Sequence, residues 1–73
     1  MLLLTWLIHM AMAEPDNSED LRQAEELFLN GQQLYNEQRY NAAIIAWKEG
    51  YEMTKLPAFL KNIALAQEAM NEY

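Results

Sequence analysis

The side chains that could do chemistry are few, and their spacing forms no recognisable reactive site. The chain has one histidine, His9, and no cysteine, and no serine or threonine is placed with a plausible base, so nucleophilic catalysis lacks its parts. The pairs Glu25–Glu26 and Glu68–Glu72 could be acid–base carboxylates, but on amphipathic helices such pairs usually belong to the solvated face. We therefore predict a protein without enzymatic activity.

The acidic stretch EPDNSED, residues 14–20, is where oxygen ligands cluster most densely. It lacks the alternating ligands, the central glycine and the distal glutamate that a calcium loop requires. Asp16, Asn17 and Ser18 are instead good N-cap residues, and Glu19 and Asp20 would follow in a first turn, where the helix dipole favours anions. We expect residues 14–20 to be a polar linker that leads into a helix, with no metal ion and no cofactor.

Length and charge restrict both the size of the fold and the kind of partner. The 73 residues allow one small domain, and a chain of this size buries only about 60% of its unfolded surface. Eleven acidic and five basic side chains give a net charge of −6, which argues against nucleic acid, because phosphates require a basic surface. The same charge argues against an anionic membrane surface. The expected partner is a protein or a peptide.

Residues 1–13, MLLLTWLIHMAMA, contain no formally charged side chain and precede the polar stretch. This run is too short to span a bilayer as a helix, but it suits the hydrophobic region of a secretory signal. Ala11 and Ala13 provide the small-x-small pattern of a cleavage site before Glu14, although no lysine or arginine precedes the run. We expect a cleaved signal peptide; the alternatives are a retained apolar anchor and a helix that docks on the rest of the chain.

The stretch from residue 19 to residue 53 has the pattern of two helices joined by a tight turn. Apolar or small residues recur at helical spacing in both halves, which places them on one face of each helix. Only the short polar link 36–39 separates the two runs, so the helices are predicted to be antiparallel neighbours. We predict helices over residues 19–38 and 40–53, with Gly31 of the first packed against Ala43 of the second.

A third helix is predicted to begin at Pro57, whose fixed φ suits a first turn, after a connection formed by residues 54–56. We expect Leu56, Phe59, Leu60 and Ile63 to pack on the preceding hairpin. One side of this helix consists of Phe59, Leu60, Ile63, Ala64, Gln67 and Met70, and the residues that widen the stripe are Leu65, Ala66 and Ala69. The predicted fold is therefore all-α, an antiparallel helical hairpin plus a third helix.

Residues 21–73 resemble the tetratricopeptide repeat family over about one and a half repeats. The first unit carries the resemblance at Leu27, Gly31, Tyr40, Ala43, Trp47, Gly50 and Tyr51. In a partial second copy, Leu60 and Tyr73 repeat Leu27 and Tyr40 after 33 residues, one fewer than the usual period. The family's proline near the end of the second helix is missing, and Thr54 stands near that place. The resemblance implies a helical-repeat module over residues 21–73.

The resemblance also implies a concave groove, lined by the first helix of each unit. Phe28 and Tyr35 would suit an apolar or aromatic peptide, or another helix; Phe28 could equally belong to the core, and Tyr35 is expected to be exposed. Some family members bind the C-terminal carboxylate of a chaperone. They have other residues at the positions of Phe28 and Gln32, and only Asn62 matches them. The implied groove residues are Phe28, Gln32, Tyr35, Asn36, Lys61, Asn62, Leu65 and Glu68.

The third helix is further expected to carry an association strip formed by Leu65, Ala69 and Met70. We expect these residues on a flank that another helix would cover, because solenoid repeats need about three units for stability. A larger partner, residues 2–13 or a second copy could cover the strip, most simply in a two-fold dimer. We predict an exported, periplasmic or cell-envelope interaction module, or alternatively a small membrane-associated subunit that retains residues 1–13.

Overall fold

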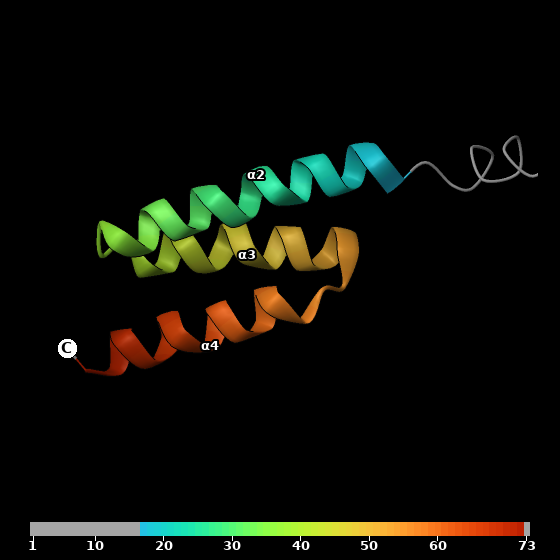
Figure 1. Cartoon of the computed structure of the whole chain (residues 1–73). Coiled ribbons are helices and arrows are strands. Elements are labelled where there is room, and N and C mark those ends of the chain that lie inside the picture. The colour runs from blue at the N-terminus through green and yellow to red at the C-terminus, as the bar shows by residue number, and fades with distance from the viewer. Residues whose placement is uncertain (1–16, 73) are drawn as a thin grey trace, which may run out of the picture.

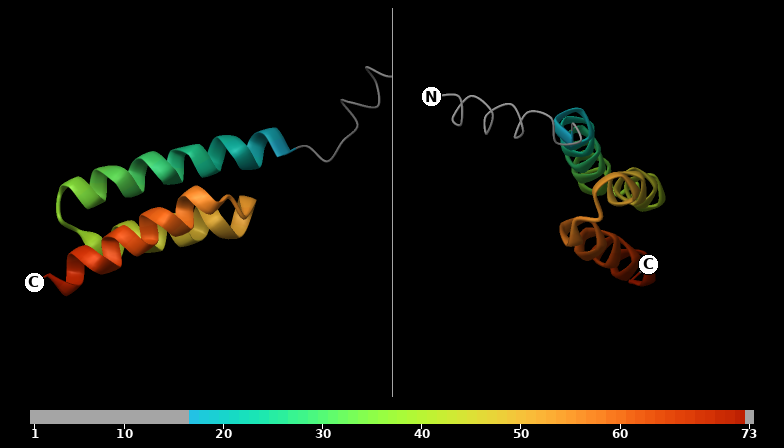
Figure 2. Two further views of the ribbon diagram at one scale, coloured as in Figure 1. Left: turned by 60° about the horizontal axis from the view of Figure 1, so that its bottom comes forward. Right: turned by 90° about the vertical axis from the view of Figure 1, so that its right-hand side faces the viewer.

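The computed structural model describes residues 17–72, which form three α-helices (Figure 1). Helix α2 spans Asn17–Asn36, α3 spans Tyr40–Thr54 and α4 spans Pro57–Asn71. Helices α2 and α3 form an antiparallel hairpin, and α4 also packs on α3 and runs in the same direction as α2 (Figure 2). The predicted all-α fold, a helical hairpin plus a third helix, is confirmed.

The apolar segment 1–13, its predicted cleavage site, residues 14–16 and Tyr73 lie outside the described residues. Within the described range, no helix has the length and the apolar character needed to cross a membrane.

The turn between α2 and α3 depends on Gln38, which adopts a left-handed backbone conformation with φ of 64°. This residue cannot continue a right-handed helix, so α2 ends at Asn36 and not at Gln38 as predicted. The N–H of Arg39 then donates to the carbonyl of Leu34 at 2.8 Å and satisfies an otherwise free helix end. At the other end of α2, Glu19 and Asp20 lie in the first turn, as predicted.

The connection between α3 and α4 is shorter than predicted, because Thr54 belongs to α3. Its hydroxyl donates to the carbonyl of Gly50 at 3.0 Å and accepts from the N–H of Leu56 at 3.2 Å. Lys55 ends the helix in a left-handed conformation with φ of 58°. Leu56 is extended, as residues before a proline usually are, and Pro57 begins α4 as predicted.

The core lies along α3, where α2 and α4 cover it from two sides. Trp47 contributes the largest buried ring, at 2% exposure. Its indole Nε1 donates to the carbonyl of Phe28 at 3.1 Å, so the polar atom of the ring is satisfied inside the core. The buried hydrophobic residues are Ala24, Ala43, Ile44, Ala46, Trp47, Phe59, Ile63 and Ala66. Four of these are alanines, which allow the helices to approach closely.

The two glycines stand where aromatic rings cross from a neighbouring helix. A Cβ atom at Gly31 would lie 2.6 Å from Cε2 of Trp47, and one at Gly50 would lie 2.5 Å from Cζ of Phe59. The atoms nearest to a Cβ at Gly31 thus belong to Trp47. The long indole of Trp47 reaches across the interface and occupies the space above this glycine. Gly31 and Ala43 are both buried, and their direct packing stays a prediction.

Helix α4 buries a narrower stripe than predicted. Phe59, Ile63 and Ala66 are buried, at the spacing of four and three residues that keeps side chains on one face. A residue next to Phe59 in the sequence is rotated by about 100° around the helix, so Leu60 leaves this face and is 47% exposed. Of the residues predicted to pack on the hairpin, Leu56 and Leu60 are exposed. The exposed residues among the others predicted on the same side are Ala64, Gln67 and Met70.

Candidate functional site

Helices α2 and α4 enclose a series of hollows that follow one another along their length. Phe28 and Gln32 are one turn apart on α2, and Ala58 and Asn62 are one turn apart on α4. Phe28 and Ala58 line the first hollow, and Gln32 and Asn62 line the second. Tyr35 lines both this second hollow and a third. We call the three hollows together the α2/α4 groove; α3 lies behind it in the view of Figure 1, as Figure 2 makes clear.

The first hollow, of about 270 Å³, is almost entirely apolar. The rings of Phe28 and Phe59 meet there edge to face, with centroids 5.6 Å apart and an interplanar angle of 74°, and join α2 directly to α4. Leu21 and Leu56 stand beside them at 51% and 44% exposure, so apolar surface remains open to a partner. The lining residues are Leu21, Ala24, Glu25, Phe28, Leu56, Ala58 and Phe59.

The second hollow, of about 150 Å³, combines amides with an aromatic and an aliphatic side chain. Tyr35 is half-buried and not exposed as predicted. Its ring lies 5.2 Å from that of Tyr40 and 6.1 Å from that of Trp47, measured between centroids, and these contacts hold it down on the core. The lining residues are Gln32, Tyr35, Asn36, Trp47, Asn62 and Leu65. Each amide offers both donors and acceptors to the backbone of a bound chain.

The third hollow, of about 350 Å³, lies at the far end of the groove. Tyr35 and Tyr40 line it from the hairpin, and Ala69 and Glu72 line it from the C-terminal end of α4 and the residue that follows it. The groove thus changes from an apolar end to a polar and aromatic end.

The structure brings most of the predicted groove residues together. Five of the eight line the second hollow: Gln32, Tyr35, Asn36, Asn62 and Leu65. Phe28 lines the first hollow and also packs against the core, so it is both a groove residue and a core residue. Lys61 and Glu68 line none of the three hollows and are exposed. They lie seven residues apart, on the side of α4 away from the buried stripe.

Several groove residues are absent from the sequence prediction. Trp47 and Phe59 belong to the buried core, and each ring is large enough to line a hollow as well. Leu21 and Glu25 precede Phe28 by seven and three residues, which places them on the same face of α2. That spacing was the available indication for these two residues.

The predicted association strip does not form one continuous flank. Leu65 and Ala69 line hollows of the α2/α4 groove. Met70, at 37% exposure, follows Phe59 by eleven residues and lies on the same stripe as Ile63 and Ala66. The flank of α4 that faces away from the groove carries Leu60 and Ala64 instead.

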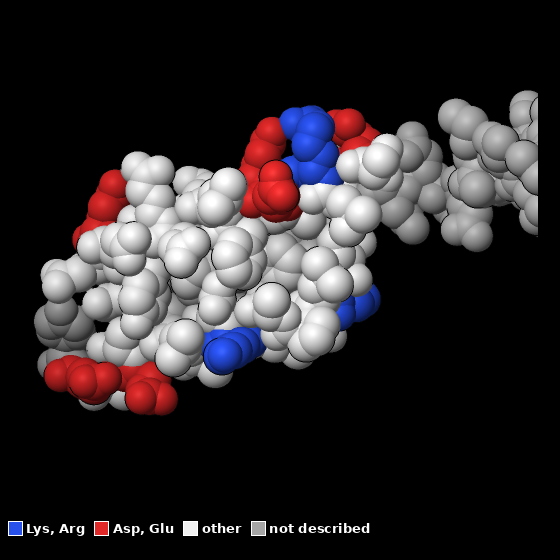
Figure 3. All heavy atoms as spheres, viewed as in Figure 1, with Lys and Arg blue, Asp and Glu red and all other residues white. Residues whose placement is uncertain are grey.

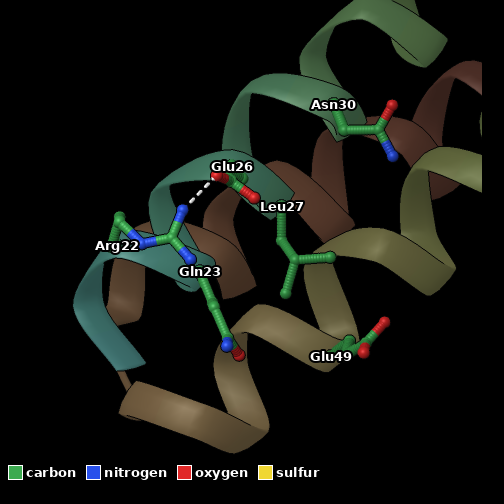
Figure 4. Close-up of a pocket in the computed structure, with 6 residues that line it drawn as sticks. All are labelled: Arg22, Gln23, Glu26, Leu27, Asn30 and Glu49. Carbon is green, nitrogen blue, oxygen red and sulfur yellow. Dashed lines mark hydrogen bonds and ion pairs between the residues drawn. The ribbon is translucent and has the colours of Figure 1, made fainter. Parts of the chain in front are cut away.

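A larger and more polar hollow, of about 460 Å³, lies on a different face of α2 (Figure 4). Arg22 donates to Glu26 at 2.5 Å and to Glu19 at 2.6 Å. The hydrogen bond to Glu19, with the charges of Glu19 and Glu26, raises the pKa of Arg22. The lining residues are Arg22, Gln23, Glu26, Leu27, Asn30 and Glu49. With Leu27 as its single large apolar side chain, this hollow offers a weaker anchor for a partner than the α2/α4 groove.

Residues 17–72 contain no group of three histidine, cysteine, aspartate or glutamate side chains placed to hold a metal ion. The chain matches no protein-family model, no curated protein and no solved structure. Its function is therefore argued from the groove itself.

Proposed function

We propose that the chain is a non-enzymatic protein-interaction module that binds a peptide or a helix in the α2/α4 groove. The observation that carries this proposal is the convergence of Gln32 and Tyr35 of α2 with Asn62 and Leu65 of α4 around one hollow. Amides beside apolar and aromatic surface can hold the backbone of a bound segment and bury its side chains at the same time. The neighbouring apolar hollow extends this surface along the helices.

We also propose that residues 21–73 form a module of the tetratricopeptide type. Support comes from the two positions where the family pattern has small residues, Gly31 and Gly50. At each of them an aromatic ring, of Trp47 or Phe59, approaches too closely to leave room for a Cβ atom.

The groove can be tested with two leucines of α4 that are equally exposed but lie on different flanks. Leu65 is 46% exposed and lines the groove, whereas Leu60 is 47% exposed and lies outside it. Peptides are first selected from a random displayed library on the full chain. We expect Leu65→Glu to weaken their binding by about tenfold or more, which corresponds to about 1.4 kcal/mol, because it places a charge in the hollow.

The matched variant Leu60→Glu should leave the dissociation constant unchanged within about a factor of two. Both constants are measured by fluorescence anisotropy, and circular dichroism checks that both variants keep their helices. If no peptide can be selected, or if both variants bind as well as the parent chain, the groove is not the binding site.

We further propose that the module acts after export, in the periplasm or cell envelope of a bacterium. The uncharged apolar run 1–13 and the alanines at positions 11 and 13 support this proposal. The alternative is a small membrane-associated subunit of a larger complex, with residues 1–13 retained as an apolar helix.

Cleavage separates these two proposals. When the full chain is expressed in a bacterium, we expect the intact mass of the periplasmic form to correspond to a chain that begins at Glu14. A species that retains Met1 and sediments with membranes would contradict export and support the membrane-associated subunit.

A further inference from the structure

We propose that the occupant of the α2/α4 groove is a basic amphipathic segment of another protein. Its apolar side chains would lie in the groove, and its lysines or arginines would lie opposite the acidic side chains at the ends of the groove. This inference rests on the proposed function and adds the chemistry of the partner.

The apolar half of the argument comes from leucines that the fold leaves open along the groove. Leu21 and Leu56 flank the first hollow, and Leu65 lines the second, each about half exposed. Leu56 and Leu65 are separated by nine residues, which is about 13 Å along α4. A partner therefore needs apolar side chains spread over two or more helical turns.

The charged half of the argument comes from the ends of the groove. Glu25 lines the first hollow and Glu72 the third, and Asp20 lines a small hollow of about 180 Å³ that shares Leu21 and Leu56 with the first. No lysine or arginine lines any of these four hollows. Figure 3 faces the groove and shows mainly uncharged surface between α2 and α4, with acidic groups along α2 and at the end of α4. Basic groups on this face lie on α2, on the outer side of α4 and near the link between α3 and α4.

The carboxylates of Asp20, Glu25 and Glu72 are exposed and form no ion pair with residues 17–72. Of the basic side chains on this side of the molecule, Arg22 pairs with Glu19 and Glu26, and Lys55 pairs with Glu52 at 3.2 Å. Lys61 is exposed on α4 but lines none of the hollows. The charged side chains that line the four hollows are therefore all acidic. Charges of this kind attract a cationic partner and reject an anionic one, and their effect weakens with salt.

The same charges disfavour the two other occupants that the sequence offers. Residues 1–16 contain no lysine or arginine, and Glu14 and Asp16 would bring further carboxylates close to Asp20. A second copy carries the same net charge of −6, so two copies repel each other. A basic segment of a different protein meets neither obstacle.

The test uses two fluorescein-labelled helical peptides of about 15 residues, which is about 22 Å and matches the length of α4. Both have leucines three and four positions apart; one has lysines and the other has glutamates at the remaining positions. The full chain is titrated into each peptide, and binding is followed by fluorescence anisotropy. At about 0.05 M salt we expect the lysine peptide to bind at least about tenfold more tightly, and the difference to shrink severalfold at about 0.5 M.

Two variants with the same change of charge locate the effect. Glu25→Lys alters the groove and should weaken the lysine peptide by about fivefold or more. Glu49→Lys alters a carboxylate that lines the polar hollow outside the groove, so it should change binding by less than about twofold. Leu21→Ser should weaken both peptides, because it removes apolar surface and leaves the charge unchanged.

Each of the following results would overturn the inference. Equal binding of the two peptides, with a loss on Leu65→Glu, would refute the charge preference and leave the interaction module standing. Equal losses with Glu25→Lys and Glu49→Lys would mean that net charge alone acts, and failure of both peptides to bind would refute the proposed function as well. Self-association that Leu21→Ser abolishes, or competition by a peptide of residues 1–16, would assign the groove to a different occupant.

Discussion

Replacing Trp47 with alanine is expected to lower the free energy of unfolding by about 3–5 kcal/mol. The indole is 2% exposed, donates a hydrogen bond to the carbonyl of Phe28 and lies against Gly31 and Tyr35. Its removal would leave a cavity at the place where α3 contacts α2, and the backbone of Gly31 would lose the ring that covers it. In a domain of this size that loss is a large part of the total stability.

The measurement is urea unfolding followed by circular dichroism at the helix band, because the variant lacks the core indole whose fluorescence would report on this site. Ile45→Ala is the matched control on the same helix, since Ile45 is 67% exposed and its change should stay within about 0.5 kcal/mol. If the two variants unfold at the same urea concentration, Trp47 does not hold the hairpin together.

The hairpin could be predicted because its pattern is strongly periodic and its link is short. Gly31, Ala43 and Trp47 stand on the inner faces of two consecutive helical runs, and all three are buried. The end of α2 could not be predicted from composition, because Gln38 takes a left-handed conformation that usually requires glycine or asparagine. Local hydrogen bonds of the folded turn, such as that from Arg39 to Leu34, stabilise this conformation.

The orientation of α4 was harder to predict, because the sequence offers two neighbouring apolar residues at the same turn. Phe59 and Leu60 could each face the hairpin, and the choice depends on how α4 is rotated when it packs on α3. The ring of Phe59 fits over Gly50, which the sequence alone does not reveal. This choice also places Leu65 in the groove.

The candidate site was therefore predicted only where the family resemblance applies. The groove residues of α2 from Phe28 onward follow the pattern that starts at Leu27. Leu21 and Glu25 precede that pattern, and their part in the groove depends on the neighbouring Leu56 and Phe59. A contact between segments more than thirty residues apart cannot be read from the spacing of either one.

Gly31→Ala is expected to lower the free energy of unfolding by about 1–3 kcal/mol, although helix propensity alone predicts the opposite sign. Alanine in place of glycine within a helix stabilises it by about 1 kcal/mol. At Gly31, however, the new Cβ atom would lie 2.6 Å from Cε2 of Trp47, well inside the ordinary contact distance. The indole is rigid, buried and hydrogen-bonded to Phe28, so relief of this contact requires a shift of the helices.

A double-mutant cycle with Trp47→Phe tests whether that contact is the cause. Phenylalanine lacks the five-membered ring whose atoms lie closest to Gly31, so Gly31→Ala should cost less in the Trp47→Phe background, with a coupling of about 1 kcal/mol or more. Asn30→Ala, at the exposed neighbouring position, should instead stabilise α2 by a few tenths of a kcal/mol. If Gly31→Ala raises the thermal midpoint as Asn30→Ala does, or costs the same in both backgrounds, the indole does not require a glycine at this position.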